Sequence, residues 1–258
     1  METLLAEIKQ WMSMDMLKLN DSKTEIMAVG GPWCNMMELQ SLTVGNKEVD
    51  VTKCVRLRGV DSDSDLTSKQ HVWNVAKKCF YMLKNMFKIR CCINETAAKA
   101  GVHSMITSKL DYCNAILYGL LESTLKHFTR VQNLSACFIS QHGEYEHITQ
   151  VLKQLHWLPV YQRICYKVLI LTFKSLNGQA PTYLEGLMKR RPMKRTRVDG
   201  NNDLVIPAIK HKSFGGRSVG YGGPKLWNTL PKELKTCTNI NAFKKFLEAF
   251  IFEEAYLH

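Results

Sequence analysis

Residues 155–184 read LHWLPVYQRICYKVLILTFKSLNGQAPTYL and predict a long helix whose beginning and end are both marked. Pro159 suits the first helical position, because its fixed φ fits the first turn and its missing N–H would have no partner there. Asn177 and Gly178, with Pro181 beyond them, are typical of a left-handed helix stop. The apolar residues between these signals recur at helical spacing: Val160, Ile164, Val168, Leu171, Phe173 and Leu176. We therefore expect a helix that is buried on most sides.

The apolar run VLILTF inside this helix is far too short to cross a bilayer, which requires about 20 apolar residues. The chain of 258 residues is 45% apolar and 22% charged, which is typical of a globular protein that is long enough for two or three modules. Glu2 and Glu7 interrupt any apolar secretory segment at the start. We expect no membrane partner and a location in the nucleus, the cytoplasm or both.

Charge is distributed unevenly along the chain. Residues 1–65 carry 7 Lys and Arg against 11 Asp and Glu, whereas residues 66–258 carry 28 against 12. A strongly basic region favours a polyanionic partner, because each Lys or Arg that contacts a phosphate releases a counterion. A basic surface that is merely solvated explains the charge equally well, and charge alone does not separate the two interpretations.

The nine cysteines have an odd count and no regular spacing, which favours reduced thiols in an intracellular protein. Two Cys/His sets come near to a zinc site, namely Cys91 and Cys92 with His103, and Cys137 with His142 and His147. Neither spacing fits a zinc knuckle. We therefore expect no metal site in this chain.

Seven short phrases, each of which occurs once, follow one another along the chain. LHWLPV-x-x-R-I-x-Y-K and K-x-LNG-x-AP-x-YL lie in the segment quoted above. The others are WMSMDMLKLNDSKTE (11–25), SKLDYCNAILYGL (108–120), VQN (131–133), GPKLWNTLP (223–231) and FKKFLEAFIFEEAY (243–256). In this order they resemble the C-terminal region of reverse transcriptases from non-LTR (LINE-type) retrotransposons, of the jockey-like and chicken-repeat-like kind. The resemblance covers essentially the whole chain.

This resemblance implies a mainly α (α+β) chain of three parts. Residues 1–64 would be the tail of a polymerase palm with a primer-grip-like hairpin, residues 65–154 a helical thumb, and residues 155–258 a mostly helical C-terminal domain with a basic loop. The residues of the first part predict a helix over 2–15, a strand over 24–29 and two short strands around Gly45 and Asn46.

Residues 66–90 predict an amphipathic helix. Lys77, Lys84 and Lys88 fall on roughly the opposite face from an apolar stripe, which consists of Val72, Ala76, Cys79, Leu83 and Met86. In the family, the thumb rides on the template–primer duplex, so the resemblance implies that these lysines contact phosphates of RNA and DNA. The spacing alone favours lysines that only keep the helix soluble.

The remaining segments predict further helices over 94–108 and 123–139, a short one over 183–188 and a closing amphipathic helix from Asn241 onward. Residues 203–207 predict a strand. Residues 213–223 predict a glycine-rich loop that lacks the pattern of a phosphate-binding loop. Trp227 is expected to anchor this loop on the core, and the alternative is that it stacks on a base.

The segment KRRPMKRTR at 189–197 is a dense basic run. We interpret it as a nucleic-acid-binding arm, with a nuclear localisation signal or a solvated loop as the alternatives. Its cations complete the set of predicted nucleic-acid-binding residues: Lys189, Arg190, Arg191, Lys194, Arg195 and Arg197.

Reverse transcription requires carboxylates that hold two Mg²⁺ ions, and this sequence contains no Asp-Asp pair. On the family pattern the chain begins just after that pair, so the fingers and most of the palm are expected upstream. The resemblance gives Lys23 the position of the lysine that protonates the pyrophosphate leaving group, although an exposed turn residue explains it as well. We expect no cofactor in this fragment, while the parent enzyme would use Mg²⁺.

The sequence leaves two hypotheses open. In the first, the chain is a C-terminal fragment of an RNA-directed DNA polymerase that binds template–primer nucleic acid and is not catalytic alone. In the second, it is a decayed or repurposed remnant that acts as a non-catalytic protein-interaction module. Departures from the family phrases favour the second: Arg58, Leu121, Cys137 and Ser218. A patch around Trp11, Met12 and Met14 is expected to be exposed without the upstream palm.

Overall fold

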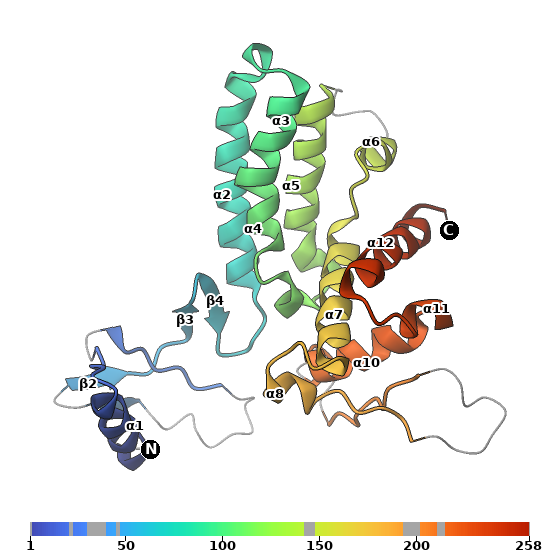
Figure 1. The fold of residues 1–258 in the computed structure, drawn as a ribbon. Coiled ribbons are helices and arrows are strands. Elements are labelled where there is room, and N and C mark those ends of the chain that lie inside the picture. The colour runs from blue at the N-terminus through green and yellow to red at the C-terminus, as the bar shows by residue number, and fades with distance from the viewer. Residues whose placement is uncertain are drawn as a thin grey trace. The chain divides into compact units, whose positions relative to one another are not determined.

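The computed structural model describes residues 2–20, 23–29, 40–44, 47–141, 148–192, 202–210 and 215–257 (Figure 1). It divides into two compact units, Met1–His71 and Val72–His258. The strands that the structure describes form two small antiparallel sheets in the first unit, and helices make up the second. The predicted class, mainly α with a small β-containing part, is therefore confirmed. The finer division at residues 64 and 154 stays a prediction.

The first unit contains helix α1 (Glu2–Met14) and two hairpins. Strands β1 (Ser41–Val44) and β2 (Lys47–Asp50) pair antiparallel, as predicted around residues 45 and 46, which themselves lie outside the described ranges. Strands β3 (Cys54–Leu57) and β4 (Val60–Asp63) form a second hairpin. Arg58 and Gly59 make its two-residue turn with positive φ values of 47° and 85°, as this tight turn requires.

The strand predicted over residues 24–29 is wrong. Ile26 alone pairs there, in a single parallel bridge to Val51. The Ile26 carbonyl accepts hydrogen bonds from the backbone N–H of Thr52 at 2.8 Å and from the Thr52 hydroxyl at 3.1 Å. The alternating pattern therefore marks an extended segment that finds one partner residue, which is too little for a strand.

Few of the residues that the structure describes in the first unit are buried. Val44 and Val60 are the buried hydrophobic residues among those that the structure describes there. On α1, Trp11 and Met14 expose 61% and 73% of their surface, and Met12 is half-buried. The predicted exposure of this apolar patch is therefore confirmed for Trp11 and Met14.

Helices α2 (Lys69–Lys88), α3 (Glu95–Val102) and α5 (Glu122–Ser140) build one end of the second unit (Figure 1). Short 3-10 turns flank them at Arg90–Cys92 and Asn114–Leu117. A π-helical turn (His103–Thr107) joins α3 to α4 (Ser108–Asp111), and Asn94 caps α3 by accepting from Ala97 N at 2.8 Å. The predicted helices are thus confirmed, and the predicted apolar stripe of α2 lies in the core: Val72, Ala76, Cys79, Leu83 and Met86.

Two ring contacts hold α5 beside α2. Trp73 near the start of α2 meets His127 near the start of α5, with ring centroids 5.2 Å apart. Phe87 near the end of α2 meets Phe138 near the end of α5, with ring centroids 5.1 Å apart. Because the starts meet each other and the ends meet each other, the two helices run side by side in the same direction.

The helix predicted from the quoted stretch is α7 (Val160–Leu176), which follows α6 (Ile148–Gln154). Pro159 is its N-cap, one position before the place predicted for it. After Leu176, Gly178 adopts a φ of +64°, and Gln179 N donates to Lys174 O at 2.9 Å, which completes the predicted left-handed stop. The helix is buried on most sides, as predicted: Val160, Ile164, Cys165, Val168, Leu169, Ile170, Thr172, Phe173 and Ser175.

The C-terminal part of the second unit contains α8 (Thr182–Glu185), α10 (Val219–Thr229), α11 (Lys232–Lys235) and α12 (Ile240–Leu257). The closing helix is confirmed: Phe243, Leu247 and Ile251 are buried in α12. The strand predicted over residues 203–207 is wrong, because only Leu204 pairs, in a single antiparallel bridge to Arg190.

The glycine-rich loop predicted over residues 213–223 is also wrong from Val219 onward, where α10 begins. A Cβ on Gly222 would lie 2.2 Å from the Tyr118 ring, and a Cβ on Gly223 would lie 2.6 Å from Thr172 Oγ1 of α7. The two glycines therefore let α10 pack closely against its neighbours. In the same helix, Trp227 is 2% exposed and donates to Asn202 O at 3.0 Å, which confirms its role in the core and leaves no face for a base.

Candidate nucleic-acid interface

Helix α2 presents an exposed face that carries lysines and no acidic residue. It carries five lysines and no Asp or Glu in 20 residues. Lys77, Lys84 and Lys88 are exposed and fall within an arc of about 40° on a helix that turns about 100° per residue. No carboxylate that the structure describes forms an ion pair with any of the three. Their predicted exposure opposite the apolar stripe is confirmed.

Two large aromatic side chains share this face with the lysines. Trp73 and Tyr81 are 52% and 69% exposed, and helical geometry places them at the two edges of an arc of about 80° that contains the three lysines. We name Trp73, Lys77, Tyr81, Lys84 and Lys88 the α2 stripe. The sequence reasoning missed both aromatic residues, although their i, i+4, i+8 spacing with Lys77 was a readable signal.

Helix α5 adds two cations beside this surface. Lys126 and Arg130 are both exposed and lie one helical turn apart. Both α2 and α5 bury their opposite sides in one hydrophobic cluster, and the ring contacts hold the two helices next to each other. Lys126 and Arg130 therefore extend the positive surface of the α2 stripe.

The basic segment is described in part. Lys189, Arg190 and Arg191 are exposed. Their backbone is held to the segment before α10, because Arg191 N donates to Asp203 O at 2.9 Å and Val205 N donates to Lys189 O at 2.8 Å. The other predicted cations lie outside the described residues: Lys194, Arg195 and Arg197. Of the predicted binding residues, the structure brings the three α2 lysines onto one face, whereas the basic segment belongs to a different element.

Lys23 lies in the first unit with an exposed side chain, and its backbone N–H donates to Asn20 O at 3.1 Å. Within the ranges that the structure describes, no group of three His, Cys, Asp or Glu side chains could hold a metal ion. His142 and His147, which belong to one of the two rejected zinc sets, lie outside those ranges. The catalytic role of Lys23 stays a prediction.

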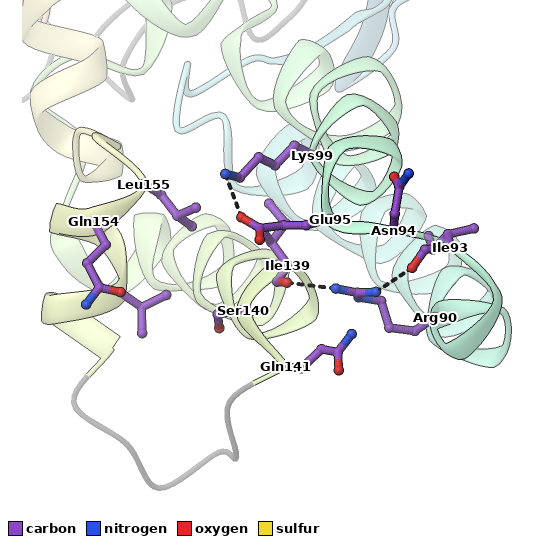
Figure 2. A pocket seen from close by; sticks show the side chains of 11 residues that line it. Arg90, Ile93, Asn94, Glu95, Lys99, Ile139, Ser140, Gln141, Gln154 and Leu155 are labelled. Carbon is purple, nitrogen blue, oxygen red and sulfur yellow. Dashed lines mark hydrogen bonds and ion pairs between the residues drawn. The ribbon is translucent and has the colours of Figure 1, made fainter.

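A pocket of about 400 Å³ lies between α3, the end of α5 and α6 (Figure 2). Its cations are engaged within the protein. Arg90 donates to the carbonyl oxygens of Ile139 at 2.9 Å and Ile93 at 2.8 Å, and Lys99 pairs with Glu95 at 2.7 Å. Arg90 thus satisfies carbonyl groups that the end of α5 leaves without a helical partner. Both cations that line the pocket are therefore paired with groups of the protein itself.

The phrases quoted from the sequence contact one another inside the second unit. Arg163, which follows LHWLPV, donates to both carboxylate oxygens of Asp111 in the DYCN phrase at 3.1 Å. Gln132 of the VQN phrase donates to Leu158 O at 2.8 Å. These hydrogen bonds join α7 to the end of α4, and α5 to the segment just before α7. These contacts give Arg163, Asp111 and Gln132 a structural role, which requires no catalytic or binding role for them.

No protein-family model matches the chain, and neither a curated protein nor a solved structure matches it. None of the helices in the described ranges is long and apolar enough to cross a membrane. Function is therefore inferred from the α2 stripe, from the charge of the second unit and from the phrases of the sequence.

Proposed function

We propose that this chain is the C-terminal part of a reverse transcriptase from a non-LTR (LINE-type) retrotransposon, and that its second unit binds RNA and DNA through the α2 stripe. The ordered phrases support the family. The exposed face of α2, with its lysines and no acidic residue, is the single observation that carries the binding role. The chain binds template–primer nucleic acid and does not polymerise alone, since its sequence has no Asp-Asp pair to hold Mg²⁺.

The electrostatics of α2 favour a phosphate backbone as the partner. Lys77, Lys84 and Lys88 lie on one side of a helix, so they can face one strand together. Each phosphate that a lysine neutralises releases counterions, and the logarithm of the binding constant then falls with the logarithm of the salt concentration by about 0.7 to 0.9 per contact. Three lysines therefore account for a slope of about 2 to 3.

The test is a salt titration of the full chain against a fluorescein-labelled RNA–DNA hybrid, followed by fluorescence anisotropy. We expect the triple variant Lys77→Gln/Lys84→Gln/Lys88→Gln to bind more weakly and to lose about 2 to 3 units of the salt slope. The matched control changes three exposed lysines on other helices of the same unit, which are Lys167, Lys225 and Lys245.

The control variant has the same net charge as the α2 variant. If both variants weaken binding equally, the second unit attracts nucleic acid only through its overall charge and the α2 stripe is not the site. Binding that does not depend on salt would contradict the proposal as a whole.

The exposed apolar side of α1 favours a second candidate function. Trp11 and Met14 are 61% and 73% exposed there, and an apolar patch of this kind is typical of a protein-interaction surface. A remnant that acts as a protein-interaction module would bind its partner through this side, and the α2 stripe would bind no nucleic acid. Absence of nucleic-acid binding at low salt, from a chain shown to be folded, would favour this function.

A further inference from the structure

We propose that the α2 stripe recognises single-stranded nucleic acid, with Trp73 and Tyr81 stacked on unpaired bases and the lysines on the phosphates between and beyond them. This inference rests on the proposed function and adds the form of nucleic acid that the site takes.

Stacking requires a base whose flat face is open. Inside a duplex both faces of each base are covered by the neighbouring bases, about 3.4 Å away along the strand. An exposed aromatic ring on a protein surface finds such a face on an unpaired base, and every base offers one. Two exposed rings in a row of lysines therefore point to an unpaired strand.

The spacing along α2 fits this mode of binding. Trp73 and Tyr81 are eight residues apart, which is about 12 Å along the helix axis, and Lys77 lies midway between them. The two rings are thus too far apart to stack on two adjacent bases of a stacked strand. They hold two separated bases, and the Lys77 ammonium group lies where the intervening phosphates pass.

The remaining lysines extend the track. Lys84 and Lys88 continue the same face to the end of the helix, so the stripe from Trp73 to Lys88 measures about 22 Å. Without a carboxylate on α2, no acidic group of this helix opposes a phosphate along that length. The stripe therefore accommodates several nucleotides of an extended strand.

The Trp73 ring is held in place before any ligand binds. Its T-shaped contact with His127, at 82° between the ring planes, fixes the indole while 52% of the residue stays exposed. A ring that is already oriented loses less conformational entropy when a base stacks on it. Because of this contact, Trp73 has a defined orientation that an exposed side chain without a neighbour would lack.

The experiment compares three fluorescent probes with the full chain: a 12-nucleotide oligouridylate, the corresponding oligothymidylate and a 12-base-pair RNA–DNA hybrid. The variants are Trp73→Ala and Tyr81→Ala. The matched control is Tyr183→Ala, which removes a ring that is 71% exposed on α8, outside the α2 stripe. The two single strands separate a preference for RNA from a preference for DNA.

We expect each stripe variant to lower the affinity for both single strands by about 5- to 150-fold, which corresponds to the loss of one stacked base. The affinity for the hybrid should change less than twofold, and the salt slope should stay as in the wild type because no phosphate contact is lost. Tyr81→Phe should keep the affinity of the wild type, since stacking needs the ring and not its hydroxyl.

Thermal melts of each variant show whether a loss of binding comes from a loss of folding. Tyr81→Ala is the safer variant in this respect, because the Tyr81 ring is more exposed than the Trp73 ring. If Trp73→Ala and Tyr81→Ala leave single-strand affinity unchanged, or lower single-strand and hybrid affinity equally, the inference is wrong. The proposed function survives that result as long as the lysine variants still flatten the salt slope. Absence of binding to all three probes would overturn both.

Discussion

The two units of this chain differ in how they use their apolar residues. In the first unit, α1 exposes Trp11 and Met14, and the buried hydrophobic residues that the structure describes there are Val44 and Val60. The second unit buries large side chains from nearly every helix in two clusters. A periodic apolar pattern therefore predicts a helix in both units, but it predicts burial only where a second apolar surface is available to cover it.

Helix α7 shows how the second unit obtains that coverage. Its first half contributes Ile164 and Val168 to the cluster that contains α2 and α5. Its second half contributes Leu169 and Phe173 to the cluster that contains α10 and α12. One helix thus joins the two clusters, which explains why it is buried on most sides. The stability of the second unit is expected to depend most strongly on this helix.

The largest expected effect is from Phe173→Ala. Phe173 is fully buried and stacks on Phe243 with ring centroids 4.3 Å apart. Loss of a buried phenyl ring removes its transfer free energy and leaves a cavity, which lowers the free energy of unfolding by about 3 to 5 kcal/mol. The measurement is urea unfolding followed by circular dichroism. Phe246→Ala, on the exposed side of α12, is the control and should change stability by about 0.5 kcal/mol or less.

A smaller effect is expected from Gly222→Ala in α10. The new methyl group would lie 2.2 Å from the Tyr118 ring, and overpacking of this kind costs about 1 to 3 kcal/mol. Gly220→Ala in the same helix is the control, because its Cβ would meet Leu187 at 3.6 Å, an ordinary contact. That variant should gain up to about 1 kcal/mol from helix propensity. Equal effects from the two glycines would show that α10 does not depend on close packing.

The same glycines show where the sequence stops being informative. The helices of the second unit follow from local periodicity and from local signals such as Asn94 and Gly178. The stretch before Trp227 is rich in glycine, a poor helix former, and its local pattern predicts a loop. In the structure this stretch is helical and packs closely against Tyr118, about a hundred residues earlier, which a local pattern does not show. The segments around Ile26 and Leu204 show the converse, since an alternating pattern there lacks the neighbouring strand that would complete it.

The candidate site was predicted in part for a related reason. Helical spacing alone places Lys77, Lys84 and Lys88 opposite the apolar stripe, and the structure confirms that they are exposed. The same spacing also puts Trp73 and Tyr81 there, but aromatic residues are common both in hydrophobic cores and on binding surfaces. Its exposure depends on whether another helix covers it, and a local pattern does not contain that information.

A modest, pH-dependent effect is expected in the first unit at Asp63. Burial would raise the pKa of this carboxyl, but hydrogen bonds from the Thr67 hydroxyl and the Ser68 N–H outweigh it and lower the pKa below its ordinary value. The charged form therefore stabilises the folded state fully above the unfolded pKa of about 3.9, and this stabilisation is lost as the pH falls through the lower folded pKa.

Asp63→Asn tests this, because it keeps an acceptor for Ser68 and removes the charge. The difference in unfolding free energy between the wild type and this variant should be present at pH 6 and should shrink as the pH falls below about 3.9. A titration of the Asp63 carboxyl carbon by NMR measures the folded pKa directly. A difference that stays constant with pH would mean that the charge of Asp63 does not stabilise the hairpin end.

The smallest effect on stability is expected from Trp11→Ser and Met14→Ser in α1. Both side chains already expose most of their surface in the folded chain, so their removal takes little apolar area from the folded state, and the unfolding free energy should change by about 0.5 kcal/mol or less. Binding of a hydrophobic dye should nevertheless fall, because the apolar patch is lost. A loss of more than about 1 kcal/mol would show that this side of α1 is covered in the folded protein, and the contrast between the two units would then fail. An unchanged stability together with reduced dye binding would show that the patch is an exposed apolar surface of the folded protein.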